Sequence, residues 1–196
     1  MLVTEKKAQE AMVTPQEDWT QSHAWSEEED AFLKILTQGL EGVMFHSFER
    51  DMFSLLKLKG FAKMHCKQTK EESENLNALK DEYIEKYNKI PFLHTERKDY
   101  WKDFIAKNKN SFSEQEIIEK VKESLEEYCA WETKALNHLM NWKKYAKDKH
   151  QVSKMIHGVI EEIEYVEKLD SILEKHGYTY EAICEMSDCL HKKYGG

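Results

Sequence analysis

Apolar residues recur every three or four positions through most of this chain, which is the spacing that gathers them on one face of an α-helix. Four long segments carry the pattern, and a shorter one follows near the C-terminus. At the boundaries, Ser111 or Ser113 caps the third helix, and Ser113 followed by Glu116 fits a capping box. Gly60 is predicted to end the first helix as its C′ residue. The predicted helices cover residues 24–58, 61–87, 114–147, 151–176 and 180–191.

The connections between these segments predict how the helices are arranged. Most are short, which favours antiparallel neighbours, but residues 88–110 have no clear period and could travel the length of a bundle. We therefore predict an all-α fold: an up-down four-helix bundle with a long crossover between its second and third helices and a short C-terminal fifth helix. The bundle domain would span residues 24–193. Residues 1–23, which are polar and aperiodic, would form a flexible N-terminal extension.

The composition agrees with long helices and narrows the possible partners. The 196 residues include only seven Gly and two Pro, and the net charge is −8. We therefore expect no broad phosphate-binding face and no nucleic-acid partner. No uncharged apolar stretch approaches about 18 residues, so we expect no membrane span. With no secretory signal at the N-terminus, the four cysteines are interpreted as reduced thiols of a cytoplasmic protein.

Each long helix has one glutamate on its apolar stripe. These residues are Glu41, Glu72, Glu132 and Glu162. Counted from the helix ends, all four would lie near mid-height, where their carboxylates must be protonated, hydrated or neutralised by cations. The pattern therefore predicts a metal site, and oxygen ligands suit iron or manganese better than zinc or copper. Asn75 and Tyr165 each lie three positions after one of these glutamates, and they are candidate weak ligands of the metal site.

Several stretches resemble the ferritin-like superfamily. Residues 60–63 (Gly-Phe-Ala-Lys) and 71–75 (Glu-Glu-Ser-Glu-Asn) are similar to the start and the ligand motif of the second ferritin helix. Residues 131–134 and 160–162 resemble the ligand-bearing stretches of the third and fourth helices. The resemblance implies that the bundle is a ferritin-like up-down four-helix bundle. It also implies that the four glutamates match the family's carboxylate ligands and that the activity is iron oxidation, with oxygen as the oxidant. It places Asn75 where the second helix carries a histidine ligand. On the fourth helix, a bacterioferritin-like register places Tyr165 where a histidine is expected, whereas the ferritin register places Ile163 where a glutamine is expected.

The histidines and cysteines offer no second site. His65 is expected to be a hydrogen-bonded core residue on the buried side of its helix, whereas His46 and His138 are expected to face away from the apolar stripes. A cysteine nucleophile would need a partner base and a lowered pKa, and the sequence indicates neither.

Three functions remain open at this point. The leading hypothesis is a di-metal protein that binds iron or manganese, with iron oxidation or storage as its chemistry. The alternative is a non-catalytic helical bundle with a degenerate metal site that acts as a binding or structural module. A third is a bundle whose internal pocket holds an organic ligand. We expect metal ions as ligands and a homo-oligomer, and we assign no catalytic residue from the sequence.

Overall fold

The computed structural model describes residues 25–95 and 112–195, and within these ranges the chain is helical apart from short connections. The predicted all-α class is confirmed. The predictions for residues 1–23 and for most of the connection 88–110 lie outside the described residues. The helices are α2 (Glu27–Leu55), α3 (Lys59–Tyr87), α5 (Glu114–Trp142), α6 (Lys149–Lys175) and α7 (Tyr180–Tyr194).

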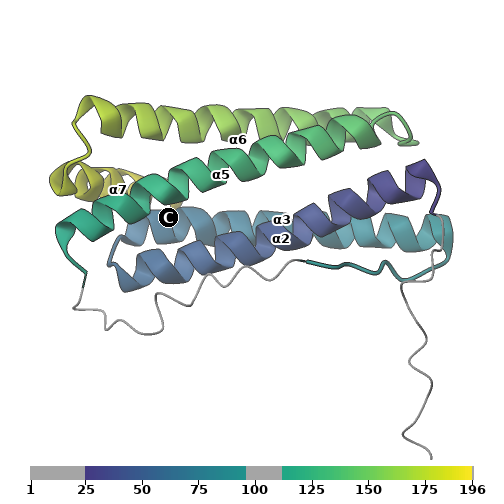
Figure 1. Cartoon of the computed structure of the whole chain (residues 1–196), viewed down its shortest axis with the longest axis horizontal. Helices are drawn as coiled ribbons and strands as arrows, with labels where there is room; N and C mark the ends of the chain where they lie inside the picture. The colour runs from purple at the N-terminus through teal and green to yellow at the C-terminus, as the bar shows by residue number, and fades with distance from the viewer. Residues whose placement is uncertain (1–24, 96–111, 196) are drawn as a thin grey trace, which may run out of the picture.

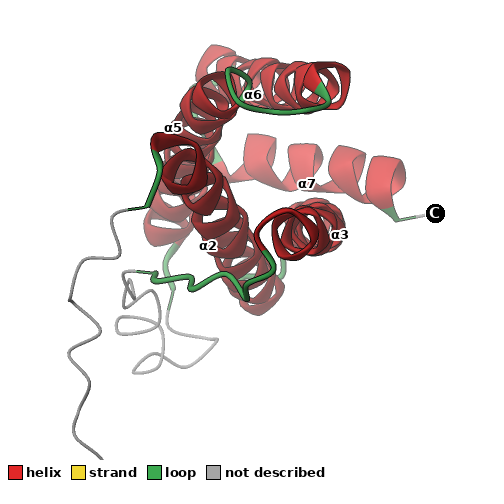
Figure 2. Cartoon of the chain, turned by 90° about the vertical axis from the view of Figure 1, so that its right-hand side faces the viewer, coloured by secondary structure: helices red, strands yellow, loops and turns green. Residues whose placement is uncertain are grey.

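The four long helices form two antiparallel hairpins. Figure 1 shows α2 paired with α3, and α5 paired with α6 above them. α5 starts at the end of the molecule where α3 starts, so these two helices run in the same direction (Figure 1). The short helix α7 crosses between the hairpins at the end where α6 finishes, and it packs on α3 and α5 (Figure 2). The long helices thus surround a common interior that α7 closes at one end.

Short polar side chains begin four of these helices. Ser113 and Glu116 form the predicted capping box at the start of α5, in which each side chain bonds the backbone N–H of the other residue. Ser26, Asp148 and Thr179 cap α2, α6 and α7 by accepting hydrogen bonds from free backbone N–H groups of the first turn. These caps fix where each helix begins, and therefore the height at which its later residues lie.

The end of α2 differs from the prediction. Leu56 is the C-cap, and the next residue, Lys57, has a left-handed backbone with φ of 64°. Gly60 lies inside the first turn of α3 instead of ending α2. Its hydrogen side chain is required for a different reason, because a Cβ there would stand 1.7 Å from the backbone oxygen of Ser187 on α7. Gly60 is a close-packing residue, and the turn is made by a lysine.

Lys57→Gly is therefore expected to stabilise the protein by about 0.5–1 kcal/mol, because glycine adopts the left-handed conformation without a Cβ clash. The free energy of unfolding in urea would measure the change. Lys57→Ala is the matched control, since it removes the exposed charge but keeps the Cβ. An equal gain in both variants would contradict the conformational explanation.

The apolar core is divided into two parts along the bundle. The part beside α7 includes Phe61 and Leu125, and the part at the far end includes Phe32 stacked on Trp142, with ring centroids 4.2 Å apart. On α3, α5 and α6 the two parts are separated by a level that carries polar residues. Three of the predicted glutamates lie at this level: Glu72, Glu132 and Glu162.

The described helices also bear on two expectations drawn from composition. None of them combines the length and the apolar character that crossing a bilayer requires. The four cysteines are free thiols, two of them exposed and two half-buried.

Candidate functional site

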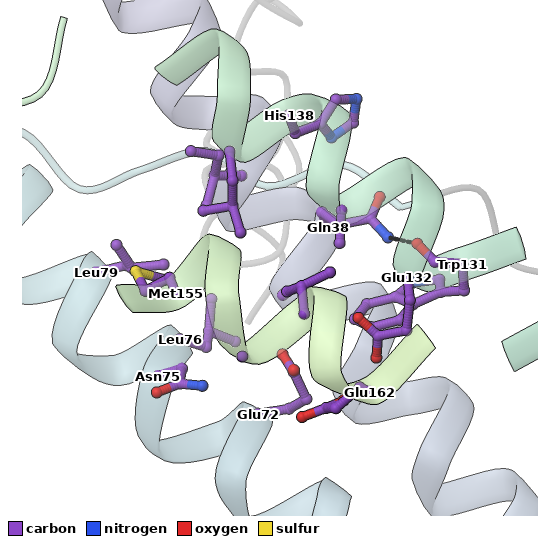
Figure 3. A pocket seen from close by; sticks show the side chains of 16 residues that line it. Gln38, Glu72, Asn75, Leu76, Leu79, Trp131, Glu132, His138, Met155 and Glu162 are labelled. Carbon is purple, nitrogen blue, oxygen red and sulfur yellow. Dashed lines mark hydrogen bonds between the residues drawn. The ribbon is translucent and has the colours of Figure 1, made fainter. Parts of the chain in front are cut away.

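The polar level contains a cavity of about 100 Å³, lined by residues from all four long helices. Figure 3 shows the side chains of Glu72, Glu132 and Glu162 pointing toward this shared space from α3, α5 and α6. The volume holds several water molecules, since one water needs about 10–15 Å³. It is smaller than the roughly 300 Å³ or more of pockets that enclose drug-sized ligands. The cavity therefore suits a small ligand or an ion.

Glu132 is the most deeply buried carboxylate of the three. Glu132 is 1% exposed, and no N–H donor or hydroxyl of the described residues reaches either carboxylate oxygen, so its one side-chain partner is the Glu162 carboxyl. Burial raises the pKa of this carboxyl strongly, and the negative charges of Glu162 and Glu72 contribute to the shift. A carboxylate without such a donor in such a place is destabilising unless a proton or a cation neutralises it.

The other two carboxylates are half-buried, whereas Glu132 is fully buried. Burial raises the pKa of Glu72 to about 7, and the charge of Glu162 adds to the effect. Burial also raises the pKa of Glu162, although hydrogen bonds to its charged form, from the protonated Glu132 carboxyl first and then from Gln68 and Tyr128, oppose the shift. One of these comes from the Tyr128 hydroxyl, 3.3 Å from Oε2 of Glu162, and Gln68 Nε2 in turn donates to that hydroxyl at 2.6 Å. Tyr128 and Gln68 thus hold the Glu162 carboxylate in place.

Unpartnered polar atoms are concentrated around this cavity. Five of the nine buried side-chain atoms without a hydrogen-bond partner in the described part of the chain belong to residues that line it. Two are the Glu132 oxygens, and the others are Gln38 Oε1, Trp131 Nε1 and His138 Nδ1. Buried polar groups are almost always satisfied by protein, water or ligand. The concentration of exceptions here indicates that the cavity takes polar occupants.

Four of the six residues predicted for the metal site line the cavity, and two do not. Glu72, Glu132, Glu162 and Asn75 are among its lining residues. Glu41 lies on the other side of α2, where its Oε2 accepts a hydrogen bond from Lys134 Nζ at 2.9 Å. Tyr165 faces α7, with Lys193 Nζ 3.7 Å from its ring centroid.

The rotation of α2 explains the position of Glu41. Its buried face runs through Gln38, Gly42, Phe45 and Glu49, whereas Met44, three residues after Glu41, is exposed. The deeply buried carboxylate of this helix is accordingly Glu49, which accepts a hydrogen bond from Ser124 and whose pKa burial raises to about 7. Glu49 does not line the carboxylate cavity.

A second buried polar group lies toward α7 and was only half predicted. His46 and His65 are both fully buried, and their Nδ1 atoms form a hydrogen bond of 2.9 Å. The core position of His65 is confirmed, and the prediction that His46 faces away is wrong. Burial lowers the pKa of His46 to about 3 and that of His65 well below its usual value, so both rings are neutral. The signal that was missed is that His46 and His65 lie at similar distances along the chain before and after the α2–α3 turn, so an antiparallel hairpin brings them close together.

The other residues that sequence reasoning missed are Gln38, Trp131 and His138. Gln38 Nε2 donates to the backbone oxygen of Trp131 at 3.3 Å, which links α2 to α5 beside Glu132. Gln38 precedes Glu41 by one helical turn, so a search for buried amides as well as acids would have found it. Trp131 and His138 lie on α5, one residue before and six residues after Glu132. Their place beside the cavity depends on contacts with α2, which the sequence of α5 alone does not indicate.

The geometry limits what the carboxylates can do together as they stand. Among the described residues, no group of three or more histidine, cysteine, aspartate or glutamate side chains is arranged to hold a metal ion. The three glutamates share the cavity without converging on one point. Their chemistry fits a positive charge, because the donors are oxygens and no N–H or hydroxyl of the described residues reaches the central one. They do not fit a four-carboxylate di-metal centre, since Glu41 is paired with Lys134.

Comparison with known proteins adds no assignment: no family model, no curated protein and no solved structure matches the chain. The functional conclusion therefore depends on the cavity and its residues.

Proposed function

We propose that this protein binds a hard divalent cation, iron or manganese, in the cavity formed by Glu72, Glu132 and Glu162. The observation that carries the proposal is the Glu132 carboxylate, which is 1% exposed, faces the cavity and lies against a second carboxyl, Glu162, with no N–H donor or hydroxyl at either oxygen. A bound cation would remove both the repulsion among the three carboxylates and the penalty of burying Glu132. Oxygen donors select hard cations over zinc or copper.

The surrounding residues would each have a defined role. Glu132 on α5 would bind the ion directly. The Tyr128–Gln68 pair would keep the Glu162 carboxylate turned toward the ion. Asn75 is an exposed residue that lines the cavity, and its amide oxygen would be a further neutral donor after the amide turns. Binding requires the carboxylate side chains to move closer together, for which the cavity has room. When bound, iron or manganese supplies a redox-active centre or a Lewis acid.

The ferritin-like architecture is part of the same proposal. Two antiparallel hairpins, with α5 running parallel to α3, support it. Because Glu41 points elsewhere and asparagine stands at position 75, we propose binding of one cation and leave iron oxidation or storage as its possible use. The competing function is a structural bundle in which protons, not metal, neutralise the carboxylates.

Adding manganese(II) to metal-free protein at pH 8 is expected to raise the melting temperature by about 5–10 °C at one hundred times Kd, since ligand binding then adds about 2.7 kcal/mol. Elemental analysis after desalting is expected to find about one ion per chain. Glu132→Gln, which keeps the side-chain shape but removes the charge, is expected to abolish both results. Glu41→Gln is the matched control and is expected to leave them unchanged.

The opposite result identifies the structural bundle. If manganese(II) and anaerobic iron(II) leave the melting temperature unchanged while Glu132→Gln melts at a higher temperature than the wild type, the carboxylates are neutralised by protons and the cation proposal is wrong.

A further inference from the structure

The cavity has two ends of different chemistry. Glu72, Glu132 and Glu162 make one end acidic. The other end is mainly apolar: Figure 3 shows Leu79 and Met155 on the side opposite Glu132 and Trp131, with Asn75 as the polar residue on that side. Leu76 and Val159 belong to the same cavity. A metal ion makes no use of an apolar wall, because its favourable neighbours are oxygens and water.

We infer that the same cavity also binds a short primary aliphatic amine, with its ammonium group among the three carboxylates and its alkyl chain along the apolar end. The inference rests on the proposed function only in that both require the cavity to take a positive charge. An ammonium carries three N–H donors and no acceptor, which complements the two Glu132 oxygens, since no N–H or hydroxyl of the described residues reaches them. Its hydrocarbon chain would leave water for a surface that is already apolar.

The geometry also specifies which amines are rejected. All three carboxylates belong to the acidic end, so a second ammonium on the same chain would have to lie against Leu79, Met155 and Val159 without a counter-charge. Because Met155 and Val159 are only half-buried, that second charge would keep part of its hydration, but it would gain no partner and would lose the apolar contact that a methyl end makes there. A monoamine is therefore favoured over a diamine of equal length, which is the reverse of what an exposed acidic surface would favour. A neutral alcohol of the same length lacks the charge and binds weakly.

Gly158 on α6 provides a way to test the apolar end separately from the carboxylates. It lines the cavity between Met155 and Glu162, and a Cβ at this position would meet no atom within 4 Å. A larger side chain can therefore occupy the space that the alkyl chain would use, without displacing the surrounding core. Gly158→Leu would leave all three carboxylates in the protein.

Isothermal titration of the metal-free full-length protein at pH 8 with ethylamine, n-propylamine and n-butylamine tests the inference. Affinity is expected to rise about fourfold for each added methylene, and n-butylamine is expected to bind at least tenfold more tightly than 1,4-diaminobutane or butan-1-ol. Gly158→Leu is expected to weaken n-butylamine binding at least tenfold while manganese(II) binding persists. Glu132→Gln is expected to abolish both.

Equal affinity along the amine series, tighter binding of the diamine, or unchanged n-butylamine binding in Gly158→Leu would overturn the inference. Manganese(II) binding without amine binding would overturn the inference and leave the proposed function standing. Amine binding without manganese(II) binding would overturn the proposed function and leave the inference standing, so the two failures are distinguishable.

Discussion

Replacing Gly60 with alanine is expected to destabilise the protein by about 3 kcal/mol, the upper range for overpacking a close contact. The added Cβ would lie 1.7 Å from the Ser187 oxygen and 2.7 Å from the His191 nitrogen, both backbone atoms of α7. Backbone cannot rotate away as a flexible side chain can, so α7 would have to move off α3. That movement would also lengthen the 3.0 Å hydrogen bond from the Gly60 N–H to Ser187 Oγ.

Urea unfolding measures this effect, and Gly158→Ala is the matched control. Gly158 lies in the interior of α6 with open space around its Cα, so alanine there is expected to stabilise the protein by about 0.5–1 kcal/mol. The two glycine-to-alanine changes therefore have opposite predicted signs. A small effect of Gly60→Ala would show that α7 does not pack on α3 as closely as described.

Replacing Glu132 with methionine is expected to stabilise the metal-free protein at pH 8 by about 1–4 kcal/mol, because a side chain of similar length then fills the site without a buried carboxylate that lacks N–H and hydroxyl donors. The gain depends on pH with a defined sign. The folded-state pKa of Glu132 is raised, so the folded state binds its proton more readily than the unfolded state does, and the penalty shrinks as the pH falls. The gain is expected to decrease by up to about 1.4 kcal/mol per pH unit between pH 8 and pH 6.

Denaturant unfolding of both proteins at pH 8 and pH 6 tests this expectation. Glu126→Met, on the exposed face of the same helix, is the control, and it is expected to change stability by less than about 0.5 kcal/mol at either pH. A destabilised Glu132→Met would indicate that the carboxylate has partners after all. A gain that does not change with pH would rule out its charge as the cause.

The helical period of the sequence determined the number and type of the elements and much of the carboxylate site. The stripes of α3, α5 and α6 are each apolar on one face only, so a glutamate on such a stripe must point inward. Glu72, Glu132 and Glu162 were found in this way. The α5 capping box was also predicted, because its two hydrogen bonds involve residues three positions apart in the chain.

The tertiary structure alone decided which face of α2 is buried. Ala31, Phe32, Leu33, Ile35 and Leu36 are all buried, so the segment 31–36, which follows the acidic first turn, is apolar on most sides and does not define a single stripe. Its rotation is set instead by packing farther along, where Trp131 lies against Gly42, within 2.4 Å of where a Cβ would be. This rotation turns Glu41 toward Lys134 and buries Gln38, His46 and Glu49.

The same distinction explains Tyr165 and the histidine pair. Tyr165 shares a face with Glu162, but α7 crosses that side of the bundle and packs against the ring, which a pattern within α6 cannot indicate. His46 and His65 meet because the α2–α3 turn brings equal heights together. The sequence by itself determined which residues share a face of each helix, because that follows from the local period. Which helix each face meets depends on contacts between residues far apart in the chain, and only the folded structure decided it.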